Sequence, residues 1–222
     1  MKLTYFPANI TFKIQKDRTN SIVIERNTLF EEFVVELKKQ IEKKGDNFLC
    51  VSEGKDIDLS REAVLIASPF DIAYEKKDLQ KKVVSYVVSE LRSSELSDEL
   101  AGIFEKLMIL LENLSLSLDF EFSFSLLDDV DFLKAVDVFL PPQEGRFAEK
   151  LISYADIIYK LTGKNIFVIA NCDAYISDED YAELCKYFRY AGLLLIWLRN
   201  RQRCLNGDEN EYIIDNDLCE LH

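Results

Sequence analysis

The segment from residue 163 to residue 219 constrains the fold of this chain more than any other. Ile166–Ala170 and Leu193–Leu198 are continuous apolar runs, which are typical of strands that are covered on both faces. Between them, Ser177 and the three acidic residues that follow it predict the start of a helix, because carboxylates favour the positive end of a helix dipole. Gly192 predicts the end of that helix. The segment therefore predicts a strand–helix–strand crossover in an α/β sheet.

The residues before this segment extend the α/β pattern and interrupt it once with helices. From about Lys76 to Leu118 the apolar periodicity is helical only, with a break near Ser93. We therefore predict an α/β head domain at residues 1–68 and 142–222, with a mostly parallel sheet, and an all-helical leg domain at residues 69–141. In the head, the apolar runs predict strands at Leu3–Phe6, Thr11–Gln15, Ser21–Ile24, Phe48–Val51 and Ala63–Ile66, and helices at residues 28–45 and 146–161.

The motifs of nucleotide hydrolases are missing from this α/β pattern. The sequence holds no GxxxxGK[ST] phosphate loop, no GxGxxG, no HExxH and no GxSxG. Asp173 follows a predicted strand, where a hydrolase could place a metal-binding acid, but it lacks the lysine and hydroxyl of a phosphate loop, so an ordinary strand-end turn is the preferred interpretation. The sequence thus predicts a hydrolase-like scaffold with another use, and a nucleotide-handling enzyme remains the alternative.

Charge, cysteine and histidine content exclude several classes of function. The chain has a net charge of −13, which predicts a soluble protein that repels nucleic acid at long range. No apolar run approaches the roughly 20 residues of a membrane span, and no signal peptide is recognised, so we expect a cytoplasmic protein. The single histidine is His222, which excludes chemistry that needs a buried histidine. Reduced thiols are expected for the five cysteines, which are Cys50, Cys172, Cys185, Cys204 and Cys219.

Basic residues nevertheless gather in local clusters that are candidates for DNA binding. Phosphate contact is the functional interpretation, because each neutralised phosphate releases a counterion; an ordinary solvated helix face is the alternative for the lysines. The arginines follow a buried strand at the carboxyl edge of the sheet, where α/β folds bind ligands, so they form the best single basic site. The candidates are Lys38, Lys39, Lys43, Lys44, Lys76, Lys77, Lys81, Lys82, Arg199, Arg201 and Arg203.

An acidic cluster in the leg is a candidate calcium site. Asp119, Glu121 and Asp128 are close in sequence, and calcium prefers several carboxylate oxygens from flexible segments. Asp119 and Glu121 also alternate with apolar residues, which is typical of the solvated face of a strand. Both interpretations stay open.

Four segments together resemble a known family, the small accessory proteins of spacer acquisition in type II-A CRISPR systems (the Csn-two family). They are Asn165–Asn171, Tyr175–Asp180, Leu194–Arg201 and Tyr212–Cys219. The resemblance implies a hydrolase-like head that has lost its phosphate loop, a helical leg, calcium binding and no catalytic activity. It also implies a homotetrameric ring around double-stranded DNA that loads from free ends and assists the CRISPR integrase proteins and the RNA-guided effector nuclease.

The resemblance assigns roles to particular positions. Arg201 falls on the arginine that ends the last core strand of the family, and Asp119 and Glu121 fall on its calcium-binding acidic step. Ser123 stands where relatives tend to carry another acid, so calcium binding here needs Asp128 or Asp129 instead. We therefore expect a non-catalytic DNA-end-binding ring. The other alternative is a protein-interaction adaptor whose acidic leg docks a basic partner.

Overall fold

The computed structural model describes residues 1–118, 120, 122–125, 129–203 and 209–221. The chain divides into two compact units, which we call the head (Met1–Ala73 and Gln143–His222) and the leg (Tyr74–Pro142). The leg expected at residues 69–141 corresponds to the second unit. Among the described residues, no helix is both long and apolar enough to cross a membrane.

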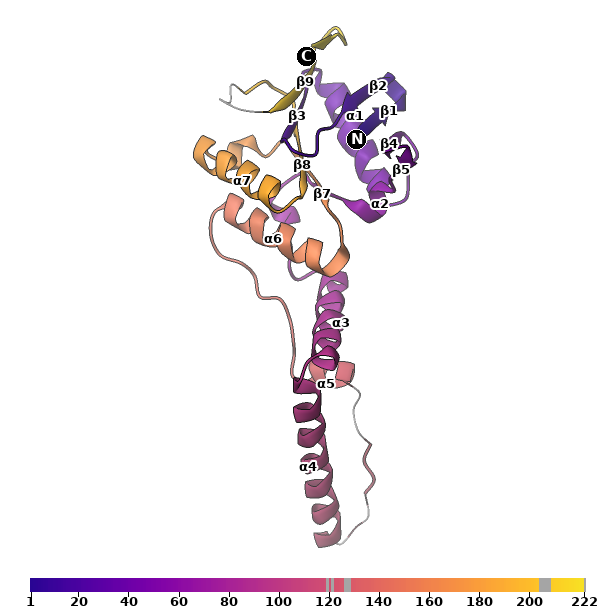
Figure 1. Ribbon diagram of the computed structural model, residues 1–222, viewed down its shortest axis with the longest axis vertical. Coiled ribbons are helices and arrows are strands. Elements are labelled where there is room, and N and C mark those ends of the chain that lie inside the picture. Colours follow the sequence, from indigo (N-terminus) through magenta and orange to yellow (C-terminus); the bar gives the residue numbers. More distant parts are fainter. Residues whose placement is uncertain (119, 121, 126–128, 204–208, 222) are drawn as a thin grey trace. The chain divides into compact units, whose positions relative to one another are not determined.

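The head contains a six-stranded sheet in the order β10-β9-β3-β8-β7-β6 (Figure 1). All neighbouring strands are parallel except β10, which pairs with β9 in the antiparallel direction. Every residue of β3, β7 and β8 is buried, as the continuous apolar runs predicted. The predicted α/β class is confirmed. The strands are β3 (Asn20–Ile24), β6 (Ala63–Ile66), β7 (Ile166–Ala170), β8 (Leu194–Arg199), β9 (Asn210–Ile214) and β10 (Glu220–Leu221).

Four further strands form a separate antiparallel sheet in the order β2-β1-β4-β5. They are β1 (Lys2–Tyr5), β2 (Ile10–Lys13), β4 (Phe48–Ser52) and β5 (Lys55–Asp56). The sequence predicted three of these strands but not that they leave the main sheet. Their burial alternates along the strand, so only one face of this sheet is covered, whereas the strands of the parallel core are buried on both.

Helix α1 (Asn27–Ile41) packs between the two sheets. Its buried residues Leu29, Phe33 and Leu37 belong to one hydrophobic core with residues of both sheets. Phe33 lies edge-on to Tyr5 and Phe48, with ring centroids 5.0 Å and 4.9 Å away. Edge-to-face pairs at such distances each stabilise the contact by about 0.5–1.5 kcal/mol beyond the burial of apolar area. The short helix α2 (Leu59–Glu62) leads into β6.

Two helices, α6 (Phe147–Thr162) and α7 (Asp178–Tyr190), cover the other face of the main sheet (Figure 1). Phe188 and Tyr181 of α7 lie edge-on to Phe167 and Trp197 of the sheet. As predicted, α7 begins at Ser177, whose Oγ accepts a hydrogen bond from the Asp180 amide (3.1 Å).

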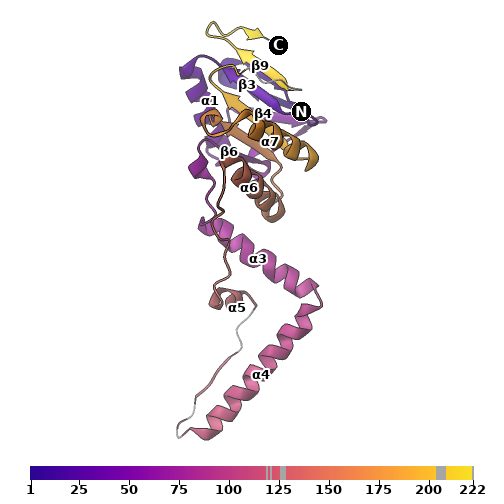
Figure 2. The ribbon, with the colours of Figure 1, turned by 90° about the vertical axis from the view of Figure 1, so that its left-hand side faces the viewer.

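The leg is helical, as predicted, with α3 (Lys77–Ser93) and α4 (Leu96–Ser117) separated at Ser94 (Figure 2). A third helix, α5 (Asp129–Ala135), was not predicted. Helix α3 buries Leu79, Val83 and Val88, whereas no residue of α4 is buried. Single-turn 3-10 helices occur at Phe6–Ala8, Pro69–Asp71 and Asp173–Tyr175 in the described chain.

Candidate functional site

The connection between β3 and α1 has no room for a phosphate loop. Only Glu25 and Arg26 separate the last residue of β3 from the first residue of α1. The Glu25 amide still donates to Ile214 O of β9 (3.0 Å), so this residue continues the strand pairing. A phosphate loop needs a stretch of several residues, some of them glycine, whose backbone amides surround the phosphates. The turn after this strand therefore cannot surround a nucleotide phosphate.

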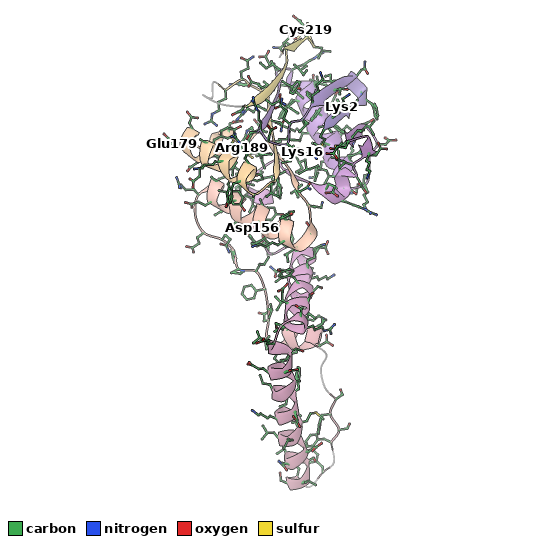
Figure 3. All side chains as sticks on the ribbon, viewed as in Figure 1. Lys2, Lys16, Asp156, Glu179, Arg189 and Cys219 are labelled. Carbon is green, nitrogen blue, oxygen red and sulfur yellow. The ribbon has the colours of Figure 1, made fainter. Side chains whose placement is uncertain are left out.

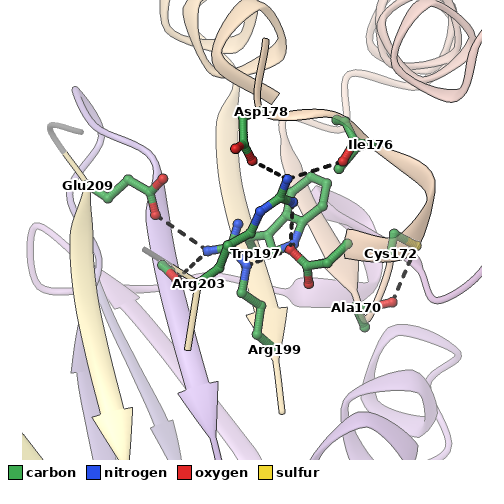
Figure 4. A network of polar contacts seen from close by, with 10 residues as sticks. Ala170, Cys172, Ile176, Asp178, Trp197, Arg199, Arg203 and Glu209 are labelled. Atoms are coloured by element: carbon green, nitrogen blue, oxygen red, sulfur yellow. Dashed lines mark hydrogen bonds and ion pairs between the residues drawn. The ribbon is translucent and has the colours of Figure 1, made fainter. Parts of the chain in front are cut away.

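Asp173, the residue that a hydrolase could use to bind a metal, is instead the centre of a polar network (Figure 4). Its Oδ1 accepts hydrogen bonds from Arg199 Nε (2.8 Å), Trp197 Nε1 (3.2 Å) and Arg203 Nη1 (3.3 Å). Two guanidinium groups thus neutralise one carboxylate. Asp173 is a structural partner of arginines here, in agreement with the strand-end interpretation.

The interpretation of Arg199 as a DNA contact is corrected by its position, because the residue is only 1% exposed. As the last residue of β8 it points to the α7 face of the sheet, where Nη1 donates to Ser21 Oγ (2.8 Å) and pairs with Glu209 (3.5 Å). Its guanidinium carbon lies 4.9 Å from the centroid of the Tyr181 ring. Arg199 therefore holds β3, β8 and α7 together and is not available to phosphates.

Arg203 also forms ion pairs within the head, whereas the side chain of Arg201 is exposed. Arg203 Nη2 donates to the Ile176 carbonyl oxygen (3.2 Å) and pairs with the Asp178 carboxylate at the start of α7. Of the three predicted arginines, only Arg201 presents its side chain to solvent, and the structure brings the other two together on Asp173.

The interior of this network holds groups with shifted pKa values. Burial raises the pKa of Tyr181, which keeps this phenol neutral. Burial also raises the pKa of Glu209, although Arg199 opposes the shift. Burial lowers the pKa of Arg199, but Tyr181 and Asp173 outweigh it, so the net shift is upward. Within the described part of the chain, the hydroxyl of Tyr181 and Nη2 of Arg199 have no hydrogen-bond partner.

The two buried cysteines among the described residues, Cys50 and Cys172, are not activated nucleophiles. Burial raises the pKa of Cys172 to about 12 and that of Cys50 to about 11. Cys50, Cys172, Cys185 and Cys219 are free thiols, in agreement with the expected reduced state; Cys204 lies outside the described residues.

The predicted lysines of the head form a surface of mixed sign around the end of α1. Lys38, Lys39, Lys43 and Lys44 are all exposed. However, Lys39 pairs with Glu36 (2.6 Å) and Lys44 with Glu42 (2.7 Å). The local carboxylates compensate part of this positive charge.

The predicted lysines of the leg are less compensated. Lys76 lies at the N-cap of α3, and Lys77, Lys81 and Lys82 follow on the same helix, all of them exposed. Lys77, Lys81 and Lys82 form no ion pair with any residue that the structure describes. The apolar stripe of Leu79 and Val83 is buried on the other side of α3. This lysine face, which we define as Lys77, Lys81 and Lys82, is the strongest basic surface among the predicted candidates.

The predicted calcium ligands Asp119, Glu121 and Asp128 lie outside the described residues. Within the described ranges, no group of three or more His, Cys, Asp and Glu side chains is arranged to hold a metal ion.

The sequence missed several members of the polar network, namely Ser21, Asp178, Tyr181 and Glu209. One signal was present for Ser21: it is a hydroxyl residue directly before the apolar run Ile22–Ile24, and a buried hydroxyl needs a partner. The others come from segments that only the fold brings together.

Comparisons with known proteins point to one family. Residues 24–218 match the family model of a CRISPR-associated protein, Cas_Csn2. The solved structure of Stu0660 of Streptococcus thermophilus is similar over 100% of this chain and 76% of that chain, with a TM-score of 0.68 and 16% identity. MJ1267, an ATP-binding cassette of an ABC transporter in its ADP conformation, gives a TM-score of 0.43 at 12% identity over 91% of this chain and 80% of that chain. No curated protein matches the chain.

Proposed function

The chain belongs to the Cas_Csn2 family of CRISPR-associated proteins, and from this premise we propose that it is a non-catalytic protein that binds the ends of double-stranded DNA. We propose that it does so as a homotetrameric ring that assists spacer acquisition. The cytoplasm is the expected compartment, and the CRISPR integrase proteins and the RNA-guided effector nuclease are the expected partners.

One observation carries the proposal: three uncompensated lysines lie together on α3 in a chain with a net charge of −13. Most of the surface repels phosphates, so DNA can approach only where cations cluster. Lysines on a helix face contact backbone phosphates without reading bases. The lysine face therefore fits recognition of DNA by its backbone.

A lack of catalysis is supported by the carboxyl edge of the sheet. The turn from β3 to α1 cannot surround a phosphate, and the carboxylate of Asp173 forms ion pairs with two arginines, Arg199 and Arg203. A nucleotide hydrolase needs both a phosphate-binding loop and an acid that is free for the metal.

Self-association is supported by the surface of α4. Leu96, Leu100, Ile103, Leu107, Leu110 and Leu114 recur at alternating spacings of four and three residues, which is the pattern of a coiled-coil seam. Ile103 is 56% exposed and Leu110 is 65% exposed within the single chain. A helix that leaves such a stripe uncovered favours association of copies through the leg.

The experiment is a gel-shift comparison of linear and covalently closed circular double-stranded DNA at low salt. A ring that loads from ends binds the linear form only. The triple variant Lys77→Glu/Lys81→Glu/Lys82→Glu should abolish the shift, whereas Lys13→Glu/Lys16→Glu/Lys186→Glu, with the same charge change on exposed head residues, should retain most of it. Equal binding to both DNA forms would exclude the ring, and retention by the α3 variant would exclude the lysine face.

We propose in addition that Asp119, Glu121 and Asp128 bind calcium. Three carboxylates within one short segment support this, because calcium takes several oxygen ligands. Calorimetric titration of the full chain with calcium should show binding that Asp119→Asn/Glu121→Gln removes and Glu105→Gln/Glu112→Gln, a matched change on α4, retains.

A further inference from the structure

The head has an acidic groove that the proposed DNA-binding function does not use. It has a volume of about 490 Å³ and lies along α1 beside the first residues of the chain. No cation lines it. The acidic groove is lined by Tyr5, Pro7, Thr28, Glu31, Glu32, Val35, Glu36 and Asn47.

Two of the three carboxylates in the acidic groove are uncompensated. Glu36 pairs with Lys39 and accepts a hydrogen bond from Asn47 Nδ2 (2.7 Å). Glu31 and Glu32, one turn earlier on α1, are exposed and have no ion-pair partner in the described parts of the chain. The groove therefore offers negative charge to a ligand from outside the chain.

A buried phenol points to the same ligand. Tyr5 is 1% exposed, yet it lines the groove. Its ring is fixed between Phe33 and Phe48, with centroids 5.0 Å and 4.8 Å away. Its ring is buried, whereas its hydroxyl is not among the buried unsatisfied polar atoms of the described chain; it forms no hydrogen bond with any described residue and can therefore bond a ligand in the groove. Burial, and then Glu32 and Glu36, raise the pKa of Tyr5, so the group is a neutral donor and acceptor.

Apolar side chains flank the acidic groove. Val35 and Pro7 line the groove, and Val35 is 44% exposed; Phe6, next to Pro7 in the sequence, is 51% exposed. Exposed aromatic and aliphatic residues beside charged ones are typical of the rim of a protein-binding site.

The arrangement discriminates between ligand classes. DNA is excluded by the sign of the charge. A single metal ion does not fit either, since these carboxylates are not among any described group placed to hold one. An alkyl guanidinium or ammonium group fits, because its several donors can bond separate carboxylates and a phenol oxygen while its methylenes contact apolar residues.

We propose that the acidic groove binds an arginine- or lysine-containing segment of a partner protein. Glu31 and Glu32 receive the cation, the Tyr5 hydroxyl accepts one of its hydrogen bonds, and Phe6 and Val35 contact neighbouring apolar side chains of that segment. The site is separate from the lysine face of α3, so the two surfaces serve ligands of opposite charge.

The test uses the full chain and a fluorescein-labelled peptide of alternating arginine and leucine, with fluorescence anisotropy at low salt. The same peptide with citrulline in place of arginine is the matched probe, since citrulline keeps the shape and removes the charge. Glu31→Gln/Glu32→Gln should weaken binding about tenfold, from two exposed ion pairs of up to about 1 kcal/mol each. Tyr5→Phe, which keeps the ring, should weaken it about fivefold by loss of one hydrogen bond.

The control variant is Glu179→Gln/Glu183→Gln, with the same charge change on α7, which covers the opposite face of the sheet from α1 (Figure 3). It should bind the peptide as the unaltered chain does. If the citrulline peptide bound as tightly as the arginine peptide, or if the control variant lost as much affinity as Glu31→Gln/Glu32→Gln, binding would be unspecific attraction and the proposal would be overturned. Weaker self-association of Glu31→Gln/Glu32→Gln without any change in peptide binding would assign the groove to a second copy and overturn it as well.

Discussion

At the residue scale, Arg199 shows how one buried charge organises the carboxyl edge of the sheet. It is the last residue of β8, and it reaches Ser21 of β3, Asp173 after β7 and Glu209 before β9. A buried cation is costly unless carboxylates and hydroxyls surround it, and here they come from three separate segments.

Replacing Arg199 by methionine should therefore destabilise the head strongly. The change leaves Glu209, whose side chain is only 15% exposed, without its cation, and breaking such a pair around a buried arginine costs about 3 kcal/mol. Urea denaturation followed by tryptophan fluorescence gives the free energy of unfolding. Lys16→Met removes the cation of an exposed pair with Glu53 and should change that energy by less than about 0.5 kcal/mol. Equal costs for the two variants would contradict the structural role of Arg199.

Glu209 predicts a pH dependence of stability. Burial raises its pKa above the ordinary 4.5, so the folded state holds this proton to higher pH than the unfolded state does. Between the two pKa values the folded state binds more protons, and its stability falls as pH rises. Glu209→Gln should remove this contribution. Thermal melts from acid to neutral pH should show the unaltered chain losing stability relative to the variant; parallel curves would contradict the shift.

Residue types could be predicted at this edge, but their roles could not. The pattern placed Arg201 and Arg203 correctly after the second buried strand, but not Arg199. It did not show that the strand continues through Arg199, because the apolar run ends at Leu198 and an arginine normally marks the surface. Only the positions of Ser21, Asp173 and Glu209, which are distant in sequence, turn this arginine inward.

At the scale of elements, local signals predicted the helix starts and ends best. Ser177 caps α7, and Gly192, which was predicted to end it, follows in the left-handed conformation (φ 69°) with its amide bonded to Arg189 O (3.2 Å). Such signals lie within a few residues of sequence and need no tertiary context.

Ser177→Ala should destabilise the head by about 1 kcal/mol, because the Asp180 amide loses its acceptor. The matched control is Arg26→Ala at the N-cap of α1, where no side-chain hydrogen bond is present. That variant should stay within about 0.5 kcal/mol of the unaltered chain. Chemical denaturation of both variants measures the difference, and similar losses would argue against the cap.

Pairing of the strands was less predictable than their existence. The continuous apolar run of β7 indicates a strand that is buried on both faces. In β1 and β2 buried and exposed residues alternate, which is compatible with any sheet that is covered on one face only. The hairpin of β1 and β2 across Phe6–Ala8 was predicted and is confirmed, because its two strands are adjacent in sequence. The pairing of β1 with β4 was not predicted, because it joins segments that lie far apart in the chain. A pattern of alternation gives the exposed face of a strand but not its neighbours.

At the scale of the whole molecule, the chain consists of two units with different means of stabilisation. The head has a continuous hydrophobic core, whereas α4 of the leg buries none of its residues. The division could be predicted from the sequence, since alternation of strands and helices gives way to helices alone. The third leg helix escaped prediction because seven residues carry too little periodicity.

We expect the two units to unfold separately. Trp197 is the only tryptophan and is fully buried in the head, so its fluorescence reports the head alone, whereas far-ultraviolet circular dichroism reports both units. In urea, helical signal should be lost before the tryptophan signal. Raising the protein concentration should shift only the early transition if the leg is stabilised by self-association. Coincident transitions at all concentrations would indicate one cooperative unit.

The two-residue turn between β3 and α1 also limits what substitutions can do at this edge of the sheet. Substitution can change the chemistry of Glu25 and Arg26, but it cannot lengthen the backbone between the strand and the helix. A phosphate loop could form here only through insertion of residues, and each insertion would have to preserve the pairing of Glu25 with β9. Point substitutions in this turn therefore cannot give the head a phosphate loop.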